Sequence, residues 1–217
     1  MDIILIGYRD WALKAFSLIK FRHVQIKSES EFEFFISTKF SANMHLVFVG
    51  WSKIIPASVV SHGNCYCIHP SDLPKYRGGS PIQNQVLEGV LDTKLTLFRM
   101  NEYLDAGPVL SKTDLCLRGP IPSIFNNMTS ASVLLLEDFA YRINDAVFMK
   151  GTVQDENLAT ILPRRKPEQS EITLDDLSRL DSNKLLNKIN ALGDPYPNAF
   201  IRTVDGRKLL IKTATIE

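Results

Sequence analysis

The alternation of short strand-like runs with helical patterns in the first fifty residues constrains the fold of this chain more than any other feature. Ile3–Ile6 and His45–Val49 are short apolar runs, and residues 23–26 form another strand candidate between them. Continuously apolar runs of this length are typical of strands that are buried on both faces. We therefore expect Ile3–Ile6 to be such a strand, and residues 23–26 and His45–Val49 to be the second and third strands.

Helical patterns fill the two gaps between these runs. Asp10 is expected to cap a helix over residues 11–19, and Ser28 or Ser30 a second helix that ends near Lys39. A strand-helix-strand-helix-strand order predicts a parallel, doubly wound sheet. The turn after the first strand, GYRDWA, lacks the G-x-G-x-x-G pattern that lets a backbone approach a pyrophosphate. A nicotinamide dinucleotide is therefore not expected.

The stretch from residue 65 to residue 110 carries the candidate chemistry. The run CYCI leads into His69, and the prolines and glycines that follow force a loop and then a helix over residues 81–88. The apolar run of residues 95–100 is followed by a loop that contains Asp105. Ligands bind at the carboxyl ends of strands in open α/β sheets. A histidine and a carboxylate that meet there form a plausible proton-handling pair.

The run HPSDLPKYRGGSPIQ, followed by LDAGPVL, resembles the formyltetrahydrofolate-dependent formyltransferases. Their shared pattern is roughly Asn-x-His-x-Ser-x-Leu-Pro, a glycine-rich turn, and later Leu-Asp-x-Gly. RGG followed by SPIQ is similar to the branch that holds methionyl-tRNA formyltransferase and the nucleotide-sugar N-formyltransferases. The resemblance is clear over residues 44–110 and 163–201 and weak elsewhere. In one departure from the pattern, the asparagine two residues before the histidine is Cys67.

The resemblance implies three catalytic positions. His69 would accept the proton of the substrate amine or polarise the formyl carbonyl, and Asp105 would orient His69 and help to move the proton. The family asparagine donates a hydrogen bond to the developing oxyanion, whereas the thiol of Cys67 is only a weak donor. The sequence leaves three alternatives open. A backbone N–H or His69 itself replaces this donor; Asn64 or Asn101 reaches in from a loop; or the protein is slow or inactive.

The resemblance also implies contacts with the formyl donor, 10-formyltetrahydrofolate, and with a phosphate-bearing substrate. The expected donor contacts are Gly50, Trp51, Ile54, Ile55, Met100, Asn101, Glu102, Tyr103 and Leu104. For the two isoleucines, the alternative is a helix start packed on the core. The expected substrate contacts are Tyr8, Arg9, Pro70, Ser71, Lys75, Arg77, Gly78 and Gly79. For Tyr8 and Arg9, a solvated turn is the alternative.

Cys65, Cys67 and Cys116 give an odd count and no disulfide framework. The C-x-C-x-H spacing would place all three side chains on one face of a strand, but too far apart to converge on one ion. Buried free thiols are the expected state, and we predict no metal site.

The second half predicts a long helix over residues 132–149 and a helix over residues 181–192. The segment from residue 161, ILPRRKPEQSEITL, resembles a family element in which a basic, proline-containing strand leaves the catalytic domain. A hairpin with its turn at Asp205–Gly206 closes the chain. The expected fold is α/β: a Rossmann-like, doubly wound, mostly parallel sheet with a small C-terminal appendage of helix plus hairpin. The expected division is a catalytic domain over residues 1–162 and a C-terminal subdomain over residues 163–217.

Length and charge narrow the expected substrate. A formal net charge of +1 argues against a nucleic-acid partner, and the tail is too short for a full tRNA-binding domain. We expect an N-formyltransferase for a nucleotide-linked amino deoxysugar in surface-glycan (lipopolysaccharide) biosynthesis. The alternatives are a glycinamide-ribonucleotide-type or methionyl-tRNA-type formyltransferase, or an impaired module that binds folate or a nucleotide sugar. No apolar run is long enough for a signal peptide or a membrane span, so we expect a cytoplasmic protein. We also expect a homodimer.

Overall fold

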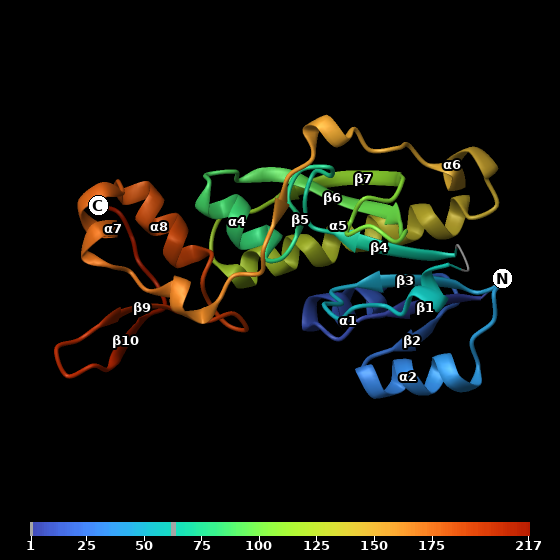
Figure 1. Ribbon diagram of the computed structural model, residues 1–217, viewed down its shortest axis with the longest axis horizontal. Coiled ribbons are helices and arrows are strands. Elements are labelled where there is room, and N and C mark those ends of the chain that lie inside the picture. The colour runs from blue at the N-terminus through green and yellow to red at the C-terminus, as the bar shows by residue number, and fades with distance from the viewer. Residues whose placement is uncertain (1, 62–63) are drawn as a thin grey trace.

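A computed structural model describes residues 2–61 and 64–217, and a central sheet with helices on both faces dominates it (Figure 1). The sheet has six strands in the order β2-β1-β3-β4-β6-β7. The first four are parallel, and β6 runs antiparallel to both β4 and β7. The strands are β1 Ile3–Ile6, β2 Val24–Ile26, β3 His45–Val49, β4 Cys65–His69, β6 Asp92–Arg99 and β7 Val109–Cys116. The expected α/β, mostly parallel fold is confirmed.

The central strands are buried because both of their faces are covered. Alternate residues of a strand point to opposite faces, so Leu5 and Val47 face a core built with α1 and α5, while Ile4 and Phe48 face one built with α2 and α3. Helix α5 runs along the sheet in Figure 1. The helices are α1 Asp10–Leu18, α2 Glu29–Thr38, α3 Ala57–Val60, α4 Pro81–Leu87, α5 Ile121–Arg142, α6 Ala146–Lys150, α7 Leu174–Arg179 and α8 Ser182–Asn190.

Two expectations about helices are wrong in detail. The helix predicted over residues 132–149 starts at Ile121 and ends at Arg142, because Pro122 fits a first helical turn and Asp145 caps the separate helix α6. Asp10 is the first residue of α1, and no side chain caps that helix. The cap at Ser28 is confirmed, since its side chain accepts the backbone N–H of Glu31 at 3.1 Å.

The last quarter of the chain, which includes α7 and α8, forms the appendage at the left of Figure 1. Strand β8 (Ile161–Leu162) pairs in parallel with β5 (Arg77–Gly78), and two 3-10 turns cover Glu156–Leu158 and Pro167–Ser170. Helices α7 and α8 lead to the hairpin of β9 (Ala199–Arg202) and β10 (Lys208–Ile211), as expected. A small apolar cluster that includes Ile189 and Ala199 packs this region. The boundary at residue 162 stays a prediction.

Among residues 2–61 and 64–217, no helix combines the length and the apolar character that a membrane crossing requires.

Candidate active site

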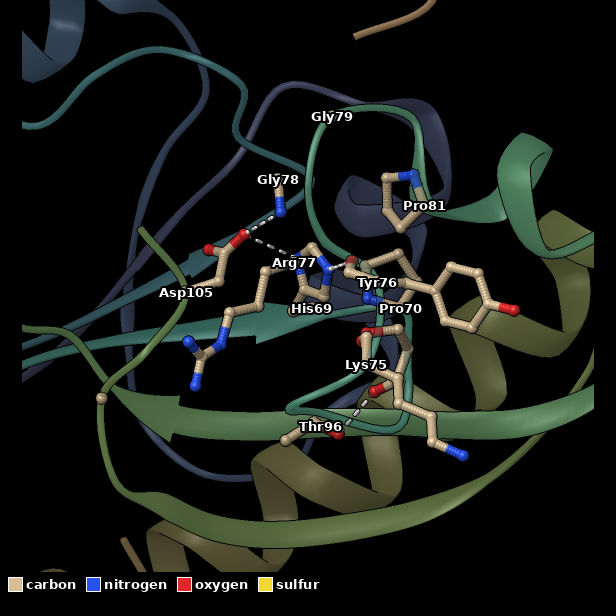
Figure 2. Close-up of polar contacts among 12 residues, drawn as sticks. His69, Pro70, Lys75, Tyr76, Arg77, Gly78, Gly79, Pro81, Thr96 and Asp105 are labelled. Atoms are coloured by element: carbon tan, nitrogen blue, oxygen red, sulfur yellow. Dashed lines mark hydrogen bonds and ion pairs between the residues drawn. The ribbon is translucent and has the colours of Figure 1, made fainter. Parts of the chain in front are cut away.

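His69 and Asp105 meet in the structure, as the sequence predicts. His69 ends β4, and its Nδ1 lies 3.5 Å from Oδ2 of Asp105 (Figure 2). The two side chains are mostly buried, with exposed fractions of 8% and 16%. A proton at Nδ1 would therefore be stabilised by a carboxylate that water screens only weakly.

The two residues do not meet for the predicted reason. Strand β6 is antiparallel to β4 and pairs Arg99 with Tyr66 and Thr96 with His69. The carboxyl end of β6 therefore lies beside the amino half of β4, away from His69. The loop after β6 folds back to bring Asp105 to the histidine.

The hydrogen bonds of His69 define which ring nitrogen can act as a base. Nε2 lies 2.8 Å from the backbone carbonyl oxygen of Tyr76, which can only accept (Figure 2). Nε2 must therefore carry a proton, and the neutral ring keeps its lone pair on Nδ1. This leaves Nδ1, the nitrogen that faces Asp105, as the atom that gains or loses a proton.

Asp105 is held in an unusual backbone conformation. Its φ is +51°, in the left-handed region that a residue with a Cβ rarely adopts. Its Oδ2 accepts the backbone N–H of Gly78 at 2.8 Å. Two residues later, a Cβ on Gly107 would lie 1.7 Å from the carbonyl oxygen of Arg99, so only glycine fits there.

A cavity of about 790 Å³ opens in front of this pair. All nine residues expected to contact the formyl donor line it. Of the other expected site residues, it is lined by Arg9, Cys67, His69, Pro70, Gly78, Gly79 and Asp105. Ile54 is almost fully exposed and Ile55 half-buried, and α3 starts only at Ala57. The alternative of a packed helix start therefore does not hold for Ile54.

Four expected substrate contacts, Tyr8, Ser71, Lys75 and Arg77, do not line the cavity. Tyr8 packs on Trp51, with ring centroids 5.1 Å apart, and its hydroxyl bonds to the hydroxyl of Ser52. Ser71 is buried and donates to the carbonyl oxygen of Lys75 at 2.7 Å, which braces the loop after His69. The side chain of Lys75 is exposed and points away from His69 (Figure 2).

Arg77 is the largest departure from the expected site. Its side chain is only 2% exposed, and its guanidinium group points away from the His69 ring (Figure 2). The group forms a two-pronged ion pair with Glu156 at 2.8 and 2.7 Å. A guanidinium that is already paired in this way is not available to bind a substrate phosphate.

The two glycines after Arg77 make room for backbone. A Cβ on Gly78 would lie 2.5 Å from the carbonyl oxygen of Leu162, and one on Gly79 would lie 2.3 Å from the backbone nitrogen of Arg164. These glycines thus let the segment after β8 run directly over the turn, which brings Arg164 to the cavity.

The sequence analysis missed the cationic residues of this segment. Arg164, Arg165 and Lys166 line the cavity together with Arg9. Within the described part of the chain, none of the four has an acidic partner within ion-pair distance. The run PRRK was the available signal, but only the pairing of β5 with β8 reveals that it reaches the site.

Cys67 lies on the cavity wall, on the same face of β4 as His69. Burial raises the pKa of its thiol, and the negative charge of Asp105 raises it further. The thiol therefore stays protonated and is neither a thiolate nucleophile nor a strong hydrogen-bond donor. Burial likewise raises the pKa of Cys65 to about 12. The described residues contain no cluster of three or more His, Cys, Asp or Glu side chains that would suit a metal ion.

The protein has an open α/β sheet and a mostly buried His–Asp pair that faces a large cavity. These features are typical of enzymes that move a proton during group transfer. Residues 12–117 match the sequence profile of the family described as Formyl transferase. These residues therefore carry a formyl transferase domain.

Known proteins resemble the chain in sequence and in fold. It is 30% identical over 181 residues to methionyl-tRNA formyltransferase from Halalkalibacterium halodurans. The aligned region covers 81% of the chain and 54% of that protein. The chain thus spans about half the length of this relative. Methionyl-tRNA formyltransferase from Clostridium thermocellum has a TM-score of 0.77 at 28% identity, with 97% of both chains covered. A 4-N formyltransferase from Francisella tularensis has a TM-score of 0.74 at 17% identity, with 100% and 98% covered, and shows the shared fold alone.

Proposed function

We propose that the protein transfers a formyl group from 10-formyltetrahydrofolate to the amine of a nucleotide-linked amino deoxysugar, in surface-glycan biosynthesis. The observation that carries this proposal is the His69–Asp105 pair, which faces a cavity whose rim holds cations without acidic partners. The pair suits proton transfer, and the cations suit a phosphate-bearing substrate.

The cavity fits the formyl donor in size and in lining. Sites for ligands of this size usually measure about 300–1,000 Å³ and are mostly apolar, with a few polar groups. Trp51, Ile55 and Met100 provide apolar walls, and the indole N–H of Trp51 has no hydrogen-bond partner among residues 2–61 and 64–217. With Gly50 and residues 101–104, they are the residues that would hold the donor, which supplies the formyl group when it is bound.

His69 would act as the base that frees the attacking amine. Nδ1 carries the lone pair because Nε2 is committed to the carbonyl oxygen of Tyr76. When Nδ1 takes the proton, the ring becomes positively charged beside the carboxylate of Asp105, which stabilises it. The protonated thiol of Cys67 offers little to a carbonyl oxygen that gains negative charge, so a slow reaction is expected.

The cations at the rim support a substrate with phosphate groups. A guanidinium binds phosphate with two parallel hydrogen bonds, and Arg9 and Arg164 are both free to do so. The guanidinium of Arg9 lies 5.5 Å from the Tyr8 ring, and the one hydrogen bond of the Arg164 side chain within the described residues is a long one, 3.5 Å, to the carbonyl oxygen of Ser52. These contacts leave most of their donors unused.

Formylation of methionyl-tRNA is the second candidate. It is favoured by the curated relatives, such as that from H. halodurans, which carry this name. A net charge of +1 on the whole chain fits tRNA less well, because phosphate contacts dominate nucleic-acid binding.

The test is a mass-spectrometric assay with 10-formyltetrahydrofolate and a panel of amines. The panel holds UDP-, dTDP-, GDP- and CMP-linked amino sugars, methionyl-tRNA and glycinamide ribonucleotide, and His69→Ala is the control. We expect a sugar nucleotide that is heavier by one formyl group and is absent with His69→Ala. Product from methionyl-tRNA alone would overturn the sugar assignment. Donor binding without any product would favour the impaired binding module.

A further inference from the structure

A buried network joins Arg77 to the loop that carries Asp105. Besides its pair with Glu156, Arg77 donates from Nε and Nη2 to Oε1 of Gln154, at 3.1 and 2.9 Å. Gln154 is itself only 6% exposed. Its Nε2 donates to the backbone carbonyl oxygens of Asp105 at 2.9 Å and Gly107 at 2.7 Å. The amide of Gln154 therefore bridges the guanidinium and the loop.

The same network approaches Asp105 from a second side. Arg77 and Gly78 are the two residues of β5, and the Gly78 N–H donates to the Asp105 carboxylate. β5 thus holds the backbone of Asp105 through Arg77 and Gln154, and its side chain through Gly78. A left-handed backbone at a residue with a Cβ costs about 1–2 kcal/mol and persists only where the surroundings fix it.

Glu156 explains why an arginine can be buried here. An unpaired buried charge is very costly, but a carboxylate with two hydrogen bonds compensates for it. Glu156 is itself 68% exposed, so it supplies the opposite charge from the surface. The guanidinium is then fixed, and Gln154 can present its amide N–H groups only toward the loop.

We propose that Gln154, fixed by Arg77, is a positioning residue that holds Asp105 in its left-handed conformation with the carboxylate facing His69. This inference rests on the proposed formyl transfer and extends it to residues that lie outside the cavity. Neither residue contacts the cavity in which the substrates would bind. The network therefore acts on the reaction through Asp105.

The test is Gln154→Glu, which keeps the shape and the acceptor for Arg77 but removes both N–H donors to the loop. The readout that does not depend on activity is the Gly78 amide in an NMR spectrum of the full chain. A hydrogen bond to a carboxylate shifts an amide proton downfield and protects it from exchange. We expect Gln154→Glu to move this resonance upfield and speed its exchange, as Asp105→Asn does. An unchanged Gly78 amide would refute the proposal.

The activity readout is a double-mutant cycle of Gln154→Glu with Asp105→Asn. Because a misplacement of about 1 Å can cost a hundredfold in rate, we expect Gln154→Glu alone to lower kcat by roughly tenfold or more, with KM changed less than about threefold. In the Asp105→Asn background its effect should shrink to within about threefold, since residues that act through one another are not additive. Equal losses in both backgrounds would show a merely structural role and overturn the proposal.

Gln85→Glu is the matched control. It also places a carboxylate against two carbonyl groups, so it shows what this change does at a site that does not support Asp105. Gln85 is fully buried, and its Nε2 donates to the carbonyl oxygens of Pro70 and Pro81 at 2.8 and 2.9 Å, away from the Asp105 loop. Its effect should be additive with Asp105→Asn, and the Gly78 amide should stay in place. The same Gly78 change in Gln85→Glu would refute a specific role for Gln154.

The two hypotheses fail in different ways. If the wild-type protein formylates nothing in the panel, the proposed function is rejected. The resonance and exchange rate of the Gly78 amide in Gln154→Glu still test the positioning role. If the wild type is active, and Gln154→Glu has the same rate and the same Gly78 amide resonance as the wild type, only the positioning role is rejected. If Gln154→Glu does not fold, Gln154→Asn replaces it, because the shorter amide cannot reach both carbonyl groups, and the same Gly78 change is expected.

Discussion

Replacing Asp105 with asparagine should slow formyl transfer about a hundredfold. The substitution keeps the shape and an acceptor for the Gly78 N–H, so it isolates the negative charge. At the observed 3.5 Å from His69, a charge pair is worth about 332/(20 × 3.5), or ~5 kcal/mol, at an effective dielectric constant of about 20. Because the Asp105 side chain is 16% exposed, solvent weakens this interaction, and we use about 3 kcal/mol for the charge pair. This energy corresponds to about two orders of magnitude in kcat/KM.

The assay is the initial rate of formylated product over a range of amine concentrations, for wild type, Asp105→Asn and His69→Ala. Asp114→Asn is the control, because its carboxylate is 92% exposed and its ion pair with Lys94 lies at the surface, where such pairs contribute little. An Asp105→Asn protein within threefold of wild type, alongside an inactive His69→Ala, would refute the electrostatic reasoning.

Three further predictions concern other residues. Cys67→Asn should raise kcat roughly tenfold. A hydrogen-bond donor to the oxyanion increases kcat about 100-fold or more, and the strain of fitting the larger side chain offsets part of this gain. An unchanged or lower kcat at saturating substrate would contradict this prediction. Arg164→Ala should raise KM for the phosphate-bearing substrate about tenfold, whereas Lys75→Ala should not, and equal effects in steady-state kinetics would argue against the assignment. Burial lowers the pKa of His45, so the unfolded state takes up the proton first. The free energy of unfolding should therefore fall as the pH drops below about 6.5, by at most ~1.4 kcal/mol per unit. Urea unfolding at pH 7 and pH 5 should show that His45→Asn flattens this dependence, and an equally steep dependence would exclude His45.

The sheet was predictable where one local pattern determines the structure. Ile3–Ile6 and His45–Val49 are strands at the predicted residues because an apolar run of that length has no other stable place than between two layers. Strand β7 was missed because four consecutive polar residues, SKTD, interrupt its apolar pattern at the edge of the sheet. The start of α5 was missed because Pro122 and two asparagines weaken the helical pattern. Tertiary packing outweighs these local preferences.

The pair of His69 and Asp105 was predictable in its residues but not in its geometry. The resemblance identified His69 and Asp105, and the structure brings them together. Sequence order alone implied that both follow strands ending at one edge, whereas β6 runs the other way and its loop folds back. Chain direction depends on pairing between distant segments, and a local pattern does not contain that information.

The exchange of roles among the arginines illustrates the same limit. Arg77 sits within the glycine-rich motif and Arg164 lies far from it in sequence, so the motif favoured Arg77 as the phosphate-binding residue. The parallel pairing of β5 with β8 reverses this assignment, because it turns Arg77 inward to Gln154 and Glu156 and lays Arg164 over Gly79 at the cavity. The glycine-rich motif is thus explained by backbone packing, and its arginine by the support of Asp105. Under the proposed function, the positive charge for a substrate phosphate comes instead from the segment at Arg164, which lies 85 residues after Gly79 in the sequence.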